Sequence, residues 1–519
     1  MTPSLSVVFG SLAATYVFLR FLLYLTQDAK EPPAIVTGIP FVGPLIGMAR
    51  QKSGYYNQLR DTYKLPIYTL RLPFSRMYVV NATELIPAVQ KQWRTVSFAA
   101  IAADAGTLVG MSKGALEIMH KDLTSEHGFS VSWPKYITPV MSPGKDLDEL
   151  SKNAIEIFGD ELEKLSAQGT VKTGLWQWTN RIVEKATAEA VWGPENPYRD
   201  PAVAEAWKIF ESGFLTLSVF PFAKYIYPRL HRARERVAAA MIEYIHKGGH
   251  ETASGLVRKR YEHHRQFGLS HEDIARGELG NTFAVLGSTL PCALWVLYHI
   301  FSDNRVLADI RREVSALVRD TVDEEKGTIS SIDLASVRTS CPILLSTFQE
   351  ALRYRTVTPG ARVLLSDVLL DGHILLKKGS MLMIPASVQH TNVSAWGEDA
   401  GDFDYMRFTP RPGGKKLNRA AFRVFGGGHV LCPGRHFAST EIMALAALLV
   451  LRFDIVPVAG GWVEPTWKNS PVQASFPIPD EDISVEFRPR EPNKTWQIVF
   501  TGDDQSMGIV SEDVTVVEE

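Results

Sequence analysis

The chain has 519 residues, of which 45% are hydrophobic and 22% charged, the balance of a globular protein with a sizeable core. This composition excludes a mostly disordered chain, a collagen-like chain and a polytopic membrane protein. The 55 basic and 57 acidic residues leave a net charge of −2, so we expect no nucleic-acid partner.

An apolar run near the N-terminus, Leu5–Leu25, carries Arg20 as its only charge. A helix of this length spans ~31 Å, about the hydrocarbon core of a bilayer. The run exceeds the apolar part of a usual signal peptide and no positive segment precedes it. We therefore expect a membrane anchor over residues 1–27, with a cleaved signal peptide as the alternative. Residues 28–47 are rich in proline and glycine and predict a stiff hinge.

Behind the hinge, residues 48–492 predict one body that is mainly α-helical with small β-sheets. The segment Pro66–Asn81 predicts two short strands around a turn, and residues 146–320 are largely helical in pattern. Strand patterns return in the second half of the chain at Arg362–Leu370, Ser380–Pro385 and Ile483–Phe487. The chain ends in an acidic sequence, so we expect a loose tail over residues 493–519.

A second apolar run, Ala284–Phe301, is long enough to be weighed as another membrane span. It contains Ser288, Thr289, Pro291 and His299, and it continues an amphipathic helix without a loop. These features favour a long buried helix of the core.

The segment with the most chemical information is Phe425–Ala438, with the sequence FGGGHVLCPGRHFA. Cys432 is one of three cysteines, too few for a disulfide framework, and the usage suits a reducing compartment. Because proline is favoured at the first helical position, Pro433 predicts that Cys432 lies at a helix N-terminus, where the dipole lowers a thiol pKa. The glycines let the backbone approach something flat and bulky. Such a thiolate is a nucleophile or an axial metal ligand, and the alternative is an inert buried thiol.

The same segment resembles the haem-binding loop of the cytochrome P-450 superfamily, F-x-x-G-x-x-x-C-x-G, at Phe425, Gly428, Cys432 and Gly434. The resemblance implies that Cys432 is the thiolate ligand of the iron of haem b and that the other three residues belong to the cofactor-binding loop. It also implies the P-450 fold, mainly α with small β-sheets, behind a single N-terminal transmembrane helix.

Two upstream segments strengthen the resemblance. Glu350-Ala351-Leu352-Arg353 matches the E-x-x-R motif of the family, and residues 403–408 are similar to its F-x-x-E-R-F segment. The resemblance implies a buried structural network of Glu350, Arg353 and Arg407, although such a Glu–Arg pair alone is usually a surface pair. Arg362 stands where the family often has a basic partner of a haem propionate, with an exposed strand arginine as the alternative. No convincing W-x-x-x-R motif occurs near residues 120–160.

The second apolar run carries a partial match to the family pattern A-G-x-[D/E]-T. Thr289 fills the threonine position, whereas Ser288 stands in place of the acid and Leu286 in place of the glycine. Pro291 has no N–H for the carbonyl of Gly287, so we expect either a local widening beside Thr289 that seats dioxygen and water, or a packing kink. The resemblance implies that Thr289 is catalytic and helps to deliver protons to dioxygen.

The resemblance implies a monooxygenase that inserts one atom of O2 into a lipophilic substrate such as a sterol, terpenoid or polyketide, as in secondary metabolism. Thr289 with Pro291, and the non-basic Val430, are more similar to the branch of steroid 7α- and 12α-hydroxylases and prostacyclin synthase. The first alternative is therefore an isomerase or dehydratase that converts a peroxide without a reductase. The second is a haem sensor or a lipid-binding membrane protein.

The implied reaction needs electrons from outside, because the chain shows no dinucleotide fingerprint and no flavin module. We expect an NADPH-dependent flavoprotein reductase as partner, with a cytochrome b-type protein as a second donor. Five basic residues around the cysteine loop are candidates for docking the reductase, with a solvated charged face as the alternative. They are Lys415, Lys416, Arg419, Arg423 and Arg435. The anchor implies the endoplasmic reticulum membrane, with the catalytic body on the cytosolic side.

By family analogy, the substrate pocket draws on small, apolar or weakly polar residues from three parts of the chain, which suit a bulky lipophilic molecule. These residues are Ala284, Leu286, Thr358, Ala361, Ser470 and Val472.

Overall fold

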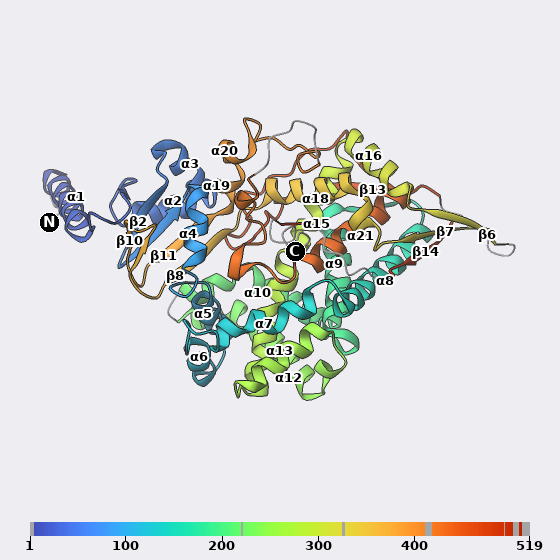
Figure 1. Cartoon of the computed structure of the whole chain (residues 1–519), viewed down its shortest axis with the longest axis horizontal. Helices are drawn as coiled ribbons and strands as arrows, with labels where there is room; N and C mark the ends of the chain where they lie inside the picture. The colour runs from blue at the N-terminus through green and yellow to red at the C-terminus, as the bar shows by residue number, and fades with distance from the viewer. Residues whose placement is uncertain are drawn as a thin grey trace.

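Helices dominate the computed structural model, and the strands form small sheets beside them (Figure 1). The structure describes residues 5–219, 222–323, 327–409, 418–491, 494–501 and 508–510. The predicted fold class, mainly α with small β-sheets, is confirmed.

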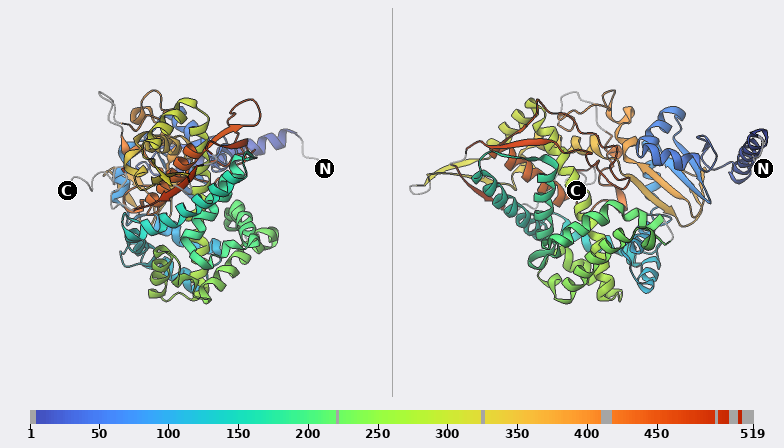
Figure 2. Two further views of the ribbon diagram at one scale, coloured as in Figure 1. Left: turned by 90° about the vertical axis from the view of Figure 1, so that its right-hand side faces the viewer. Right: turned by 180° about the vertical axis from the view of Figure 1, so that it is seen from behind.

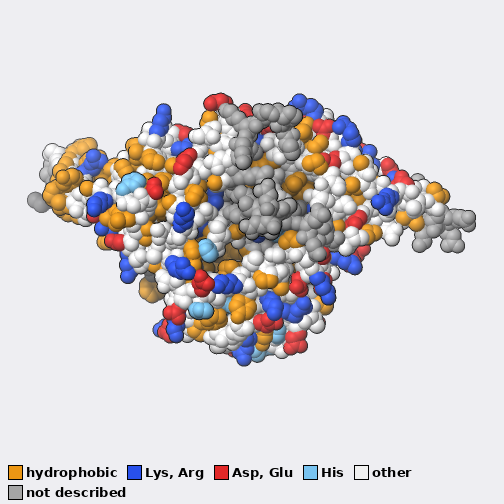
Figure 3. Space-filling model, in the orientation of Figure 1, with side chains coloured by type: hydrophobic (Ala, Val, Ile, Leu, Met, Phe, Trp, Pro, Cys, Tyr) orange, Lys and Arg blue, Asp and Glu red, His pale blue; other side chains and the backbone are white. Residues whose placement is uncertain are grey.

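The N-terminal helix α1 (Leu5–Thr26) projects from one end of the molecule, and views from two further directions agree (Figures 1 and 2). Its apolar side chains face outward, with Phe9, Leu12 and Val17 each more than 60% exposed. Hydrophobic atoms cover this end of the surface (Figure 3). Within the described residues, two helical stretches are long and apolar enough to cross a membrane, Phe9–Thr26 and His271–Phe301. Only 6% of the first is buried, against 72% of the second, so the second is a core helix, as predicted.

The largest sheet lies next to α1 and has the order β1-β2-β3-β11-β8-β4. The predicted hairpin is present as antiparallel β2 (Ile67–Leu72) and β3 (Ser75–Val80). The other strands of this sheet are β1 (Ala34–Ile35), β4 (Val96–Ser97), β8 (Pro359–Leu364) and β11 (Met381–Pro385). Strands β9 (Val368–Leu370) and β10 (Ile374–Leu376) pair as a separate hairpin.

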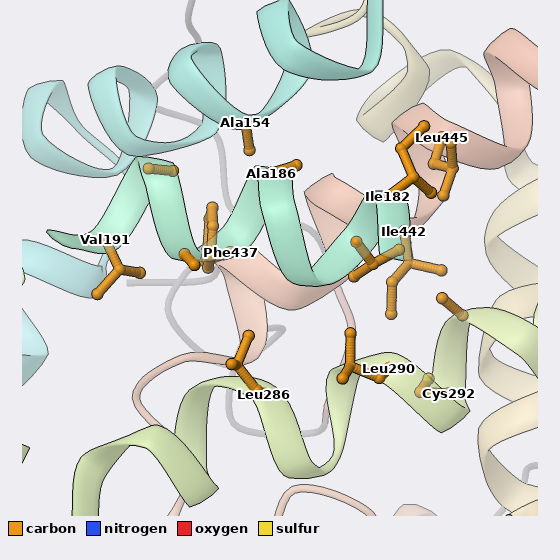
Figure 4. Close-up of a cluster of buried hydrophobic side chains, with 14 of the residues drawn as sticks. Ala154, Ile182, Ala186, Val191, Leu286, Leu290, Cys292, Phe437, Ile442 and Leu445 are labelled. Atoms are coloured by element: carbon orange, nitrogen blue, oxygen red, sulfur yellow. The ribbon is translucent and has the colours of Figure 1, made fainter. Parts of the chain in front are cut away.

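The helical part of the body surrounds α15 (Thr289–Phe301) and α21 (Arg435–Arg452), which contact each other. Every residue of α15 is buried, and so is every residue of α21 after the first two, apart from Ala438. A helix that is apolar on all sides belongs in the centre of a fold, which explains why these two form the core. Leu286 and Leu290, from the α15 side, face Phe437 and Ile442 of α21 across this core (Figure 4).

The remaining helices pack outward from this centre. Those before α15 are α2 (Gly43–Gln51), α3 (Gly54–Tyr63), α4 (Ile86–Lys91), α5 (Ala99–Val109), α6 (Lys113–His120), α7 (Phe129–Met141), α8 (Lys145–Ala167), α9 (Leu175–Trp192), α10 (Pro201–Val219), α11 (Ala223–Ile226), α12 (Pro228–His246), α13 (Gly255–Gln266) and α14 (His271–Thr282). Those after it are α16 (Asn304–Ser315), α17 (Val337–Ser340), α18 (Pro342–Arg355), α19 (Ala386–His390) and α20 (Val393–Trp396).

Two three-stranded sheets complete the body. One has the order β12-β13-β5, formed by β12 (Phe453–Pro457), β13 (Ser484–Pro489) and β5 (Val171–Gly174). The other has the order β14-β7-β6 and extends from the end opposite α1 (Figure 1), formed by β14 (Thr495–Val499), β7 (Gly327–Asp333) and β6 (Arg319–Asp323).

The chain after residue 493 differs from the predicted loose tail. Strand β14 runs parallel to β7, and Ile509 and Val510 are buried in the core. The Gln349 side-chain amide donates to the carbonyl of Gly508 at 3.1 Å and to that of Ile509 at 3.0 Å. The prediction followed the acidic end of the chain and overlooked the apolar residues before it. Residues 502–507 and 511–519 lie outside the described part of the chain.

Candidate functional site

The cysteine loop is a tight structure that requires glycine. The Cys432 N–H donates to the Phe425 carbonyl at 2.8 Å and closes the loop. Gly426 and Gly428 have φ of 80° and 59°, in the left-handed region that favours glycine. A Cβ atom at Gly426 would also lie 2.6 Å from the Val430 carbonyl oxygen. The backbone therefore folds back on itself and presents Cys432 at its end.

The helix after this loop begins later than the sequence predicts. Helix α21 starts at Arg435 with Gly434 as its N-cap residue, so Cys432 lies two residues before the cap. The prediction placed Pro433 at the first helical position and was wrong, because Gly434, with ψ of 2°, separates the proline from the helix. A Cβ atom at Gly434 would lie 3.9 Å from Cys432 Sγ, in van der Waals contact with the sulfur. Glycine at this position therefore leaves the space beside the sulfur free of side-chain atoms.

Without a bound cation, the Cys432 side chain is favoured as a neutral thiol over a thiolate. Burial raises the pKa of the Cys432 thiol, and the backbone N–H groups of Gly434 and Arg435 oppose this shift only in part. The predicted lowering of this pKa is therefore not observed. A bound cation reverses such a shift, because a coordinating thiol is deprotonated by the charge of the metal.

A buried ionic network lies behind the loop, formed by the three residues predicted for it. Glu350 and Arg353 on α18 make two hydrogen bonds of 2.7 Å, and Arg407 Nε donates to Glu350 Oε1 at 3.1 Å. None of the three side chains is more than 4% exposed. Burial opposes the charge of Arg407, but Glu350 and Asp399 outweigh it and raise the pKa of Arg407.

His390 connects this network to the cysteine loop. Its carbonyl accepts from Arg353 Nη1 at 2.6 Å, and its Nε2 accepts from the N–H of Arg423 at 2.9 Å. Burial and the charge of Arg353 lower the pKa of His390 to about 3, so the ring stays neutral and can accept. The network therefore fixes the backbone at the residue where the cysteine loop begins.

Arg362 lies on β8 and is buried. The alternative of an exposed strand arginine is therefore wrong. Burial and the nearby charge of Arg423 lower the pKa of Arg362 to about 10. Its guanidinium donates to the Ala361 carbonyl and lies over the ring of Phe98, and no carboxylate pairs with it among the described residues. Two neighbouring guanidinium groups in a buried place are the donor set expected for an anionic ligand. Sequence reasoning missed that Arg423 joins Arg362 here.

Thr289 lies directly after a widened stretch of helix. The π-helical turn η5 (Phe283–Gly287) precedes it, and Thr289 Oγ1 donates to the Val285 carbonyl at 2.9 Å. The predicted widening is therefore present, although it lies in the turn before Thr289. Ser288 Oγ donates to Ser475 Oγ at 3.0 Å and ties this turn to the loop after Ser470, a partner that the sequence did not indicate.

The predicted pocket residues do not all meet. Ser470 and Val472 line a pocket of about 90 Å³ together with Val357 and Pro359, the neighbours of Thr358. The hydroxyl of Thr358 is buried without a hydrogen-bond partner among the described atoms.

Three other predicted residues lie elsewhere. Leu286 is fully buried and packs in the helical core (Figure 4). Ala284 is exposed on η5, and Ala361 is paired with β11 in the large sheet. None of these three lines the pocket that contains Ser470.

The predicted basic docking cluster is only partly described. Lys415 and Lys416 lie outside the described residues, as does the side chain of Arg419. Arg435 is half-buried and donates to the Cys432 carbonyl at 3.1 Å. Arg423 lies under Gly427, where a Cβ atom would come within 2.5 Å of its Nη1. These two arginines therefore support the loop instead of forming an outward charged face.

With this geometry in view, comparison with known proteins identifies the class. Residues 33–487 match the family model described as cytochrome P450, which spans most of the chain, and the protein belongs to this family. A relative described as cytochrome P450 monooxygenase nodJ of Hypoxylon pulicicidum is 33% identical, over 94% of this chain and 97% of the relative. A cytochrome P450 monooxygenase of Gibberella zeae is 27% identical over 92% of each chain. The chain is accordingly a cytochrome P450 monooxygenase, an oxidoreductase of a family that uses haem-thiolate iron and O2.

Solved structures agree on the fold. The crystal structure of the cytochrome P450DA haem domain matches with a TM-score of 0.70 at 16% sequence identity, over 89% of this chain and 98% of that one. A retinoic-acid-bound cyanobacterial CYP120A1 matches with a TM-score of 0.68 at 18% identity.

Proposed function

We propose that Cys432 is the axial thiolate of haem b and that the protein oxygenates a lipophilic substrate. The observation that carries this proposal is the closed glycine loop, which presents a single half-buried thiol beside two amide N–H groups. The other residues fit the same cofactor. Arg362 and Arg423 would bind the propionates, and the loop that contains Phe425, Gly428 and Gly434 would hold the cofactor beside Cys432. When bound, haem supplies the activation of dioxygen for insertion into a C–H bond.

The residues of the chain have separate tasks in this proposal. Cys432 Sγ would hold the haem iron as its thiolate ligand, and the Glu350 network keeps the cysteine loop in position through His390. Thr289 moves a proton at Oγ1, since this hydroxyl now donates to the Val285 carbonyl at the widened turn and can exchange that bond for a water molecule.

Substrate and partners follow from the same reasoning. We propose a sterol, terpenoid or polyketide-like substrate, entering near Ser470 and Val472, because the pocket there is lined largely by apolar side chains. Helix α1 anchors the protein in the endoplasmic reticulum membrane with the body in the cytosol. Two electrons per turnover come from an NADPH-dependent flavoprotein reductase. The acidic C-terminal residues beyond 510 have no role in this proposal.

A peroxide isomerase or dehydratase is the alternative, because Ser288 replaces the acid that proton delivery to dioxygen normally uses. Such an enzyme needs neither NADPH nor Thr289. The presence of Thr289 next to a widened turn favours the monooxygenase.

Replacement of Thr289 tests the proposal. We expect Thr289→Ala to lower the rate of product formation by about 10²-fold, the lower end for loss of a positioned proton group, while NADPH oxidation continues. The measurement is product formed per NADPH consumed, with a flavoprotein reductase and a panel of sterols, terpenoids and polyketides, analysed by mass spectrometry for the gain of one oxygen. Thr289→Ser retains the hydroxyl and should retain coupled turnover. Full coupled turnover by Thr289→Ala would contradict the role of Thr289.

A further inference from the structure

The turn that carries Thr289 has no acidic side chain of its own. Its residues from Phe283 to Thr289 read FAVLGST, and Ser288 is bonded to Ser475. Reduction of dioxygen to water and an alcohol consumes two protons per turnover, so the proposed monooxygenase needs an acid near this turn. An acid from a neighbouring element that packs on η5 could meet this need.

Helix α10 packs its apolar face on the first residue of the turn. Trp207, Phe210 and Phe214 have ring centroids 4.5, 5.5 and 4.3 Å from that of Phe283. Residues spaced by three and four lie on one face of a helix. Glu211, four residues after Trp207, falls on this same face and is therefore directed toward η5.

The contact of Glu211 with the turn is close. A Cβ atom built at Gly287 would lie 3.0 Å from Glu211 Oε1, so the absence of a side chain at Gly287 makes room for the carboxyl. The segment around it is held from a second side, because Gln473 Nε2 donates to the Glu211 carbonyl at 3.0 Å. Gln473 belongs to the loop whose Ser475 holds Ser288. The same loop therefore holds Ser288 of the turn through Ser475 and the backbone of Glu211 through Gln473.

The surroundings of Glu211 raise the pKa of its carboxyl, so that a protonated fraction persists near pH 7. No hydrogen-bond donor or cation pairs with the carboxyl among the described residues. Burial and the charge of Glu184 on α9 raise the pKa of Glu211 to about 7, against the lowering effect of Lys208. Lys208 instead pairs with Glu184 at 3.2 Å. The phenol of Tyr198 also lies within electrostatic range, and burial raises its pKa.

We propose that Glu211, from α10, supplies the acid that the Thr289 turn lacks. The inference rests on the proposed monooxygenase function. Substrate C–H, O2, two electrons from the reductase and two protons give the alcohol and water. Glu211 passes a proton from the Gly287 side of the turn toward dioxygen through a water molecule, and solvent then returns a proton to the carboxylate. Glu211 is therefore a positioning residue for protons and does not contact the substrate.

The test compares Glu211→Gln with wild type and with Glu205→Gln, an exposed residue of the same helix. The assay measures product formed per NADPH as a function of pH, in protein loaded with haem. Wild type should lose coupling as pH rises through about 7, since the carboxyl then loses its proton. Glu211→Gln should form product at least ~10-fold more slowly and show no such step, whereas Glu205→Gln should match wild type.

A second variant and a second readout keep the result decisive if Glu211→Gln folds poorly. Glu211→Asp retains the acid on a shorter side chain and should restore part of the coupling together with a pH step. A readout independent of turnover is the infrared C=O band of a protonated carboxyl in the resting protein. Wild type should lose such a band as pH rises through about 7, and Glu211→Gln should lack this pH-dependent change.

Three results overturn the inference. In the first, Glu211→Gln remains coupled and keeps the pH step. In the second, it changes KM while product per NADPH is unchanged, which would make Glu211 a substrate-binding residue. In the third, wild type shows no NADPH-dependent oxygenation. The third removes the proposed function as well, whereas the first two leave it intact.

Discussion

Individual residues around Cys432 were the most predictable part of the site. Glu350, Arg353 and Arg407 form the predicted network, because a motif fixes them by type and spacing. No motif indicates the contacts of Arg423, Ser475 and Glu211. Each acts on a residue at least 60 positions away in the chain, and only the tertiary structure shows such contacts. The one local sign was the acidic Glu211 on the apolar stripe of Trp207, Phe210 and Phe214.

Loss of Glu350 should be costly because two arginines depend on it. In Glu350→Gln the buried Arg353 and Arg407 lose their shared counter-charge, and we expect about 3–5 kcal/mol less stability, the range for breaking a buried ion pair. Chemical unfolding and the haem content of the purified protein measure the effect.

Glu243 provides the matched control for this experiment. It forms an exposed pair with Lys247, so Glu243→Gln should leave both unfolding and haem content unchanged. Equal changes in stability and haem content in the two variants would contradict the structural role of the Glu350 network.

At the level of elements, hydrophobic periodicity predicted the helices and the β2–β3 hairpin, since burial on one face or on all faces leaves a direct pattern. Boundaries were less predictable. Helix α21 begins after Gly434 because the cysteine loop controls the backbone there, and β14 forms because β7 offers it an edge. Neither the closure of the cysteine loop nor the free edge of β7 can be predicted from the local sequence.

Helix α1 has a separate expected role that can be measured. Most of its apolar side chains are exposed, whereas Thr26 and Gln27 at its end bond to Arg71. Removal of residues 1–25 should therefore release the protein from membranes without loss of fold. Fractionation after carbonate washing should place the full chain in the pellet and the shortened chain in the supernatant. A full chain that washes off would contradict the anchor.

The whole molecule combines the fold of its family with local departures at the turn that carries Thr289. Family membership follows from the entire chain, but the family pattern is incomplete at Ser288 and Leu286. Helix α10 packs on this turn, and Glu211 lies close to Gly287. Contacts between separate elements depend on the assembled fold and are not contained in any single motif.

The central claim is that Cys432 ligates haem iron as a thiolate. The most direct test is the absorption difference spectrum of the dithionite-reduced protein with and without carbon monoxide. We predict a strongly red-shifted Soret band for wild type and for Cys341→Ala, in which a different buried cysteine is changed, and its loss in Cys432→Ser. An unshifted, imidazole-like band in wild type, or a red-shifted band in Cys432→Ser, would contradict the account.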